Sequence, residues 1–373
     1  MPAVTHRERF FAAVNHQPTD RPPMDFLGEP WMREALVKHL GISDFEQALQ
    51  HLDIDIRQVS HEEFGPRPVE NADGSCTDIW GIRRRPVVNS FGAYDEVEHR
   101  PFAEMIDMAQ VKDYPWPAAG MYDFTGLAER CRALHDDYVV VFGGPEIMDL
   151  VNGNSFGRGM EQLMVDIALE DPVGVALLDK RQEFFLAVAE AGLKAAGGLV
   201  DVLWIGDDYG TQNGLLVSER TWETVFGPRL QAFIDLGHRY GAKVMLHSCG
   251  SNRKLIRTWI EMGLDIYQAV QAEAVDMDPV ELFREFGRDI TFHGMVDVQG
   301  VLPYGTPEDV ARVVRERIDA SSGSGYVLSP SHNFQPDVPM DNILALYGAG
   351  ADTDRGSKPH AERKSGSNRG RVR

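Results

Sequence analysis

The sequence predicts a single (β/α)8 TIM barrel, because eight short apolar runs alternate with amphipathic stretches of helical periodicity. Runs that are apolar throughout are typical of strands buried on both faces, as in a parallel sheet covered by helices. Eight such units in about 330 residues fit one barrel. A doubly wound open sheet is the alternative architecture.

The apolar runs give the expected strands in chain order: 23–27, 54–60, 138–142, 202–205, 243–247, 264–270, 289–293 and 325–328. The amphipathic stretches give helices at 124–134, 179–196, 222–240, 251–262 and 307–320. The last helix follows Thr306, a plausible N-cap, and begins with Pro307 and two acids. Residues 77–102 alternate and turn like a β-meander, which we expect near the barrel mouth.

Composition narrows the function classes. The 373 residues include 37 basic and 57 acidic side chains, a net charge of −20, which argues against a nucleic-acid binder. No run approaches the roughly 20 apolar residues that span a bilayer. The start has no apolar signal region and three cysteines make no disulfide framework, so we expect a cytoplasmic protein. Residues 1–350 form the expected barrel, and residues 351–373 a disordered basic tail.

Active sites of such barrels lie where strands end, and His247-Ser248-Cys249 ends the fifth expected strand. Imidazole and thiolate are good zinc ligands. His332, in the loop after the last strand, is the candidate third ligand, with Glu146 and the pair Glu62-Glu63 as alternatives. The competing interpretation is a buried thiol beside a hydrogen-bonded histidine, and the residues alone leave both open.

Asp207-Asp208 ends the fourth expected strand. Neighbouring side chains on a strand point to opposite sides, so only one can face the cavity. That acid could act as a general base, bind substrate or orient a metal-binding histidine. The alternative is an anion at the N-terminus of the next helix. Further candidates for lining a substrate pocket are Gln212, Gln271, His293, Asn333 and Glu146.

Several spaced motifs resemble the uroporphyrinogen decarboxylase superfamily over about residues 5–348. They lie at 7–23, 206–212, 247–251, 292–294 and 328–333. The resemblance implies a barrel with its site at the carboxyl-terminal mouth. Uroporphyrinogen decarboxylase itself carries a histidine where this chain has His332. However, its paired arginines near the end of strand one are replaced here by a stretch containing Glu29, which does not suit a polycarboxylate.

The other branch comprises zinc methyltransferases, which use His-x-Cys after strand five and a Cys after strand eight. His247 and Cys249 match, and His332 replaces the second Cys. The resemblance therefore implies Zn²⁺ bound by His247, Cys249 and His332, and methyl transfer to or from a corrinoid carried by a partner protein. Asp207 or Asp208 and His332 are its catalytic candidates. Decarboxylation of a porphyrinogen or another carboxylated substrate is the alternative, followed by a non-catalytic binding barrel. A homodimer stays open.

Overall fold

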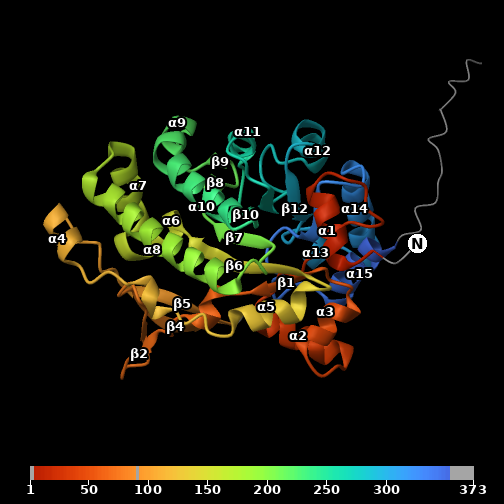
Figure 1. Cartoon of the computed structure of the whole chain (residues 1–373), viewed down its shortest axis with the longest axis horizontal. Coiled ribbons are helices and arrows are strands. Elements are labelled where there is room, and N and C mark those ends of the chain that lie inside the picture. The colour runs from red at the N-terminus through yellow and green to blue at the C-terminus, as the bar shows by residue number, and fades with distance from the viewer. Residues whose placement is uncertain (1–3, 90–91, 353–373) are drawn as a thin grey trace, which may run out of the picture.

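A computed structural model describes residues 4–89 and 92–352. Its centre is a parallel sheet of seven strands, curled like a barrel wall (Figure 1). In spatial order the strands are β1 (Ile56–Val59), β6 (Val139–Met148), β7 (Val202–Gly206), β10 (Lys243–His247), β11 (Ile266–Val270), β12 (Thr291–Val296) and β13 (Tyr326–Pro330). This confirms the TIM-barrel-like fold and the position of seven predicted strands.

The eighth predicted strand, residues 23–27, lies between the two edge strands. Asp55 N–H donates to Met24 O on one side (2.9 Å), and Asp25 N–H donates to Leu328 O on the other (3.0 Å). The segment pairs only through isolated bridges, at Met24 and Gly28. Pro22 and Pro23 remove two backbone donors here, which limits a regular ladder. The barrel is thus closed by a short irregular segment.

Helices cover the outside of this wall (Figure 1). The five predicted helices appear as α5 (Leu127–His135), α8 (Pro172–Ala196), η3 (Trp222–Phe226) with α10 (Gly227–Arg239), α11 (Arg253–Glu261) and α14 (Pro307–Ala320). Others are α1 (His6–Val14), α2 (Pro30–Leu40), α3 (Phe45–His51), η1 (His61–Phe64), α4 (Met108–Asp113), η2 (Ala119–Met121), α6 (Leu150–Arg158), α7 (Met160–Leu169), α9 (Glu219–Thr221), α12 (Pro279–Phe286), α13 (Val301–Tyr304) and α15 (Met340–Ala351). No helix among the described residues is long and apolar enough to cross a membrane.

The predicted meander at 77–102 contains β4 (Arg83–Asn89) and β5 (Gly92–His99). They belong to a four-stranded antiparallel sheet that begins earlier in the chain than expected, with β2 (Val69–Glu70) and β3 (Cys76–Thr77). Just before β4, the Trp80 ring packs against Phe184 of α8, with ring centroids 4.9 Å apart. Arg100 donates to the backbone of α6, which begins directly after β6 ends. The meander therefore lies outside the barrel wall, near its mouth. The predicted basic tail, from residue 353 onward, lies outside the described residues.

The interior of the barrel changes from apolar to polar along the strands. One buried cluster joins inward side chains of the strands to Phe10 and Val14 of α1; its strand members include Val141, Val202, Trp204, Met245, Ile266 and Val327. Two residues beyond Met245, on the same face of β10, the inward side chain is His247. The apolar layer therefore closes the barrel from below and leaves a polar layer facing the mouth.

Candidate metal centre

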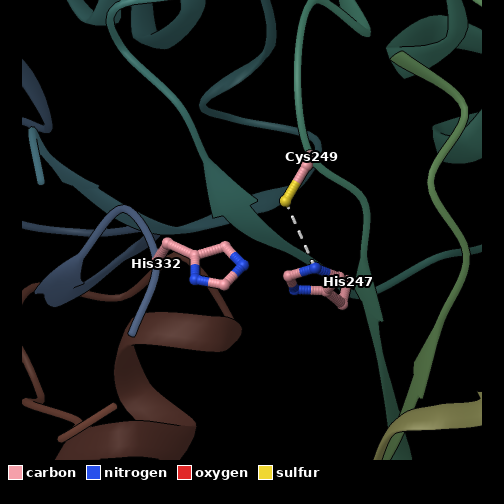
Figure 2. Close-up of side chains that lie close together, drawn as sticks. All are labelled: His247, Cys249 and His332. Carbon is pink, nitrogen blue, oxygen red and sulfur yellow. Dashed lines mark hydrogen bonds between the residues drawn. The ribbon is translucent and has the colours of Figure 1, made fainter. Parts of the chain in front are cut away.

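His247 and Cys249 meet where β10 ends. The chain bends away from the strand, and Gly250 adopts φ +83°, where a side chain would collide with backbone atoms of Gly210 and Thr211. This bend turns Cys249 back toward the histidine, so that its Sγ lies 3.3 Å from His247 Nε2 (Figure 2). Two residues separated only by Ser248 thus present both potential ligands to one point.

Gln268 of β11 sets the orientation of the His247 ring. His247 Nδ1 lies 2.7 Å from Gln268 Oε1, and Gln268 is buried. Since a carbonyl oxygen only accepts, Nδ1 carries the ring proton and Nε2 keeps its lone pair. Metal-binding histidines are characteristically held in this way through their other nitrogen.

His332 completes a triad from the loop after β13. Its ring centroid lies 5.7 Å from that of His247, and the ring is directed toward the space between His247 and Cys249 (Figure 2). One ligand atom from each of the three residues lies within 4.8 Å of the other two. Ligands of a tetrahedral zinc ion are about 3.3–3.8 Å apart. A His₂Cys donor set at this spacing fits zinc after a small contraction.

The His332 ring must change tautomer to bind a metal. Its Nδ1 accepts the backbone N–H of Asn333 at 2.8 Å, which leaves the ring proton on Nε2 in the neutral form. Binding through Nε2 requires the proton to move to Nδ1 and this local hydrogen bond to break. The pKa of His332 is lowered to about 4 by burial and by the nearby His247, so the ring is neutral at pH 7.

Asp208 is the acid that faces the triad. Its Oδ1 accepts the Cys249 N–H at 2.8 Å and lies 3.7 Å from His247 Nε2, and its Oδ2 accepts from Asn152 at 2.8 Å. Burial raises its pKa, but the charge of His247 in its protonated form and these hydrogen bonds outweigh burial and lower the pKa of Asp208 overall. An ionised carboxylate therefore stands beside the three ligand atoms and favours a cation there.

The Cys249 thiol is protonated at neutral pH in the absence of a cation. Burial raises its pKa, and the charge of Asp208 and then of Glu273 adds to the effect. A metal ion must therefore displace this proton when it binds the sulfur.

Asp207 faces the other way, as the alternation along a strand predicts. It is 2% exposed, and its Oδ1 accepts the Val151 N–H in the first turn of α6 at 2.8 Å. Burial and the charge of Asp149 raise its pKa well above the ordinary value. It therefore lies at a helix N-terminus and not beside the triad, but the helix is α6, which precedes it in the chain, and not the following helix that the alternative interpretation named.

The other predicted pocket residues divide into two groups. Gln271 Oε1 accepts the Gly250 N–H at 2.6 Å, Gln212 lies 3.5 Å from Gln271, and Asn333 donates to Glu29 at 2.6 Å, all close to the ends of the triad loops. His293, in contrast, is completely buried and lies 2.9 Å from Asp25 Oδ2. It belongs to the barrel wall and does not line the mouth in this structure.

Glu146 belongs to an acidic rim instead of the triad. Its side chain is accessible to solvent, yet burial and the charges of Glu62, Asp149 and Glu29 raise its pKa to about 7. Glu63 pairs with Arg130 at the surface. The one group of metal-ligating side chains found among the described residues contains His332 and none of these glutamates.

Two neighbours of the triad, Gln268 and Glu273, were not among the sequence candidates. Gln268 could have been found from its place one strand beyond His247, facing the same interior. Glu273 lies in an irregular loop, where sequence gives no side-chain direction.

Comparison with known proteins agrees with this fold. A methylated-thiol–coenzyme M methyltransferase of Methanosarcina mazei is 26% identical over 179 residues, which are 48% of this chain and only 44% of that relative. A solved methyltransferase structure from Methanosarcina mazei has a TM-score of 0.63 and 16% identity, covering 93% of this chain and 98% of its own. At that identity the structural likeness shows the fold alone.

The sequence model of the family Uroporphyrinogen decarboxylase (URO-D) matches residues 147–351, which are more than half of the chain. The matched region contains all three residues of the triad. Predicted from scattered motifs and now found over a continuous segment, the relationship is clear: this chain belongs to the uroporphyrinogen decarboxylase (URO-D) family.

Proposed function

We propose that this protein is a zinc-dependent methyltransferase that moves a methyl group between a small thiol or other methylated molecule and a corrinoid carried by a partner protein. The observation that carries the proposal is the convergence of His247, Cys249 and His332 at the barrel mouth. The methyltransferase relative adds support for the reaction class.

Zinc held by three protein ligands with an open fourth position would lower the pKa of a substrate thiol, so that the thiolate can act as nucleophile. In the direction from corrinoid to thiol, the partner's methylated corrinoid would be the substrate: it would give up the methyl group to the thiolate sulfur and keep the electron pair of the broken cobalt–carbon bond. The thiol proton leaves to solvent. One thiolate ligand makes the zinc more Lewis-acidic than two would.

The residues around the triad have distinct tasks in this proposal. Gln268 keeps the His247 lone pair toward the metal, and Asp208 holds the Cys249 backbone while adding negative charge. Neither must exchange a proton with the substrate. Both act by fixing the geometry of the ligands before substrate arrives.

The charge of the rim favours methyl transfer over decarboxylation of a polycarboxylate. Glu29, which stands where decarboxylases carry paired arginines, accepts a hydrogen bond from the Asn333 side chain. Glu62 and Glu146 lie near it, and their pKa values are raised by burial and by neighbouring carboxylates. A substrate with many carboxylates would meet repulsion at this rim.

Metal content provides the first test. We expect about one zinc per chain in protein purified without chelator, and a loss of most of it in Cys249→Ala. Cys76→Ala, in the distant meander, is the matched control and should keep its zinc. Wild-type protein that binds no zinc on titration would refute the proposal.

Methyl transfer can be measured with free methylcobalamin and a small thiol such as 2-mercaptoethanol. The wild type should demethylate the cobalamin and form the thioether, and Cys249→Ala should lose nearly all of this activity. Formation of coproporphyrinogen from uroporphyrinogen would instead support the decarboxylase alternative.

A further inference from the structure

The first turn of α6 is bonded to the end of β7. The N–H of Asp149, which directly precedes α6, donates to Gly206 O at 2.7 Å. Three residues later, the Asn152 side chain reaches Asp208, and its Nδ2 lies 2.8 Å from Oδ2. An ionised carboxylate only accepts hydrogen bonds, so the amide nitrogen of Asn152 is the donor. α6 therefore contacts the acid that faces the triad.

A buried arginine fixes the start of α6. Arg181 of α8 donates from Nε to Asp149 O at 2.7 Å and from Nη2 to Asp149 Oδ2 at 2.9 Å. Its guanidinium lies against Gly153, where an added Cβ would come within 2.0 Å of it. Met148 and Asp149 adopt left-handed φ values of +83° and +36°, which residues with a side chain keep only where surrounding contacts impose them. The position of Asn152 is thus set by the contacts of α6 with α8 and β7.

The Asn152 amide determines which oxygen of Asp208 is turned toward the triad. With Oδ2 bonded to Asn152, Oδ1 accepts the Cys249 N–H at 2.8 Å and lies 3.7 Å from His247 Nε2. The terminal torsion of an aspartate is broad, so the carboxylate can rotate unless a partner holds it. Asn152 is bonded to Asp208 and reaches the Cys249 loop through it.

We propose that Asn152 is a positioning residue of the site, which holds Asp208 in the rotamer that supports the Cys249 loop. Its effect on metal binding rests on the proposed function, whereas its effect on the loop does not. Groups that orient metal ligands typically contribute 10–100-fold to metal affinity without touching the metal. α6, which packs outside the strands, thereby becomes part of the machinery of the site.

The first test measures the zinc affinity of the full-length protein by competition with a chromophoric chelator. Asn152→Ala should weaken zinc binding about tenfold. Asn154→Ala is the matched control, because the Asn154 amide donates instead to Leu150 O within the same helix, also at 2.8 Å. This variant should bind zinc like the wild type. Unchanged affinity in Asn152→Ala, or an equal loss in Asn154→Ala, would overturn the assignment.

A double-mutant cycle tests whether Asn152 acts through Asp208. Asp208→Ala should itself weaken zinc binding, and adding Asn152→Ala to it should cause no further loss. A second loss of about tenfold in the Asp208→Ala background would show that Asn152 acts by another route, and the assignment would be wrong.

Alkylation of Cys249 by iodoacetamide gives a readout that needs no metal. In chelator-treated protein, mass spectrometry should show faster modification of Cys249 in Asn152→Ala than in the wild type, because the loop loses its support from Asp208. Asn154→Ala should keep the wild-type rate. If the wild type binds no zinc and Asn152→Ala still speeds alkylation, the proposed function fails and the positioning of the loop stands. Equal alkylation rates in the wild type and Asn152→Ala would overturn the assignment.

Discussion

Acidic residues have different neighbours at the two ends of the barrel. At the bottom of the barrel, an aspartate immediately precedes each of three strands: Asp55 before β1, Asp201 before β7 and Asp265 before β11. Each accepts a backbone N–H of the neighbouring strand, from Met24, Val140 and Val244 respectively. All three acids also form ion pairs: Asp55 pairs with Arg9 and Arg21, Asp201 pairs with Arg7, and Asp265 pairs with Lys243 and His238.

At the mouth, acids lie next to other acids. Burial and neighbouring carboxylates raise the pKa values of Glu62, Glu146 and Asp207. Arg181 forms an ion pair with Asp149, and even so burial raises the pKa of Asp149 to about 6. The acids at the bottom thus adjoin cations and the acids at the mouth adjoin other carboxylates, while burial raises the pKa at both ends, at Asp55 as well as at Glu146 and Asp207. Clusters of like charge with raised pKa values are typical of functional sites.

The largest expected effect tests the bottom of the barrel. Asp55→Ala should lower the free energy of unfolding by roughly 3–5 kcal/mol, because two buried arginines lose a shared carboxylate. Asp289→Ala, near the start of β12, breaks a surface ion pair with Arg257 and should change the free energy of unfolding by less than about 0.5 kcal/mol. Denaturant unfolding measures both. Equal losses would show that burial of the pair is irrelevant.

The next effect concerns the mouth and pH. Zinc affinity should rise about tenfold per pH unit between pH 6 and 8, because binding displaces one proton from the Cys249 thiol. The pKa of that thiol is raised, so the proton is present throughout this window. His332, with a pKa of about 4, releases none. Chelator competition at several pH values measures the slope, and a flat profile would exclude the thiol as a ligand.

The smallest effect is a gain in stability at the mouth. Glu146 has a pKa of about 7 in the folded protein, above its unfolded value near 4.5, so its ionisation destabilises the fold as pH rises between these values. Glu146→Gln should therefore stabilise the protein by about 1 kcal/mol at pH 8, allowing for solvent screening, and have no effect below pH 4.

Thermal or denaturant unfolding of Glu146→Gln at the two pH values checks this prediction. Glu261→Gln removes a charge far from the acidic rim and should show no such pH dependence. Destabilisation by Glu146→Gln at pH 8 would mean that the rim acids are paired after all, and the contrast between the two ends of the barrel would be lost.

Prediction from sequence was most accurate for the strands. Their apolar runs are buried by both the interior and the helices, so the pattern is strong wherever a strand exists. It was least accurate where the chain is irregular: the segment at 23–27 pairs only through bridges, and the helices α6 and α7 after β6 were not expected. Local pattern does not reveal pairing that depends on distant neighbours.

For the site, sequence brought together what lies close along the chain. His247 and Cys249 are two residues apart, and the alternation rule correctly left only one of Asp207 and Asp208 facing them. The expected end of the seventh strand at residue 293 placed His293 in the pocket, whereas β12 continues to Val296 and the His293 side chain is paired with Asp25 inside the wall. Whether an inward residue reaches the mouth depends on its depth along the strand.

The amino-acid sequence by itself determined the alternation of strands and helices, and with it which loops emerge at one end of the barrel, because burial periodicity is a local property. Only the tertiary structure decided which side chains from those loops converge. His332, Gln268 and Glu273 come from three different loops or strands, and their positions relative to Cys249 depend on barrel closure and on loop hydrogen bonds between segments far apart in the chain.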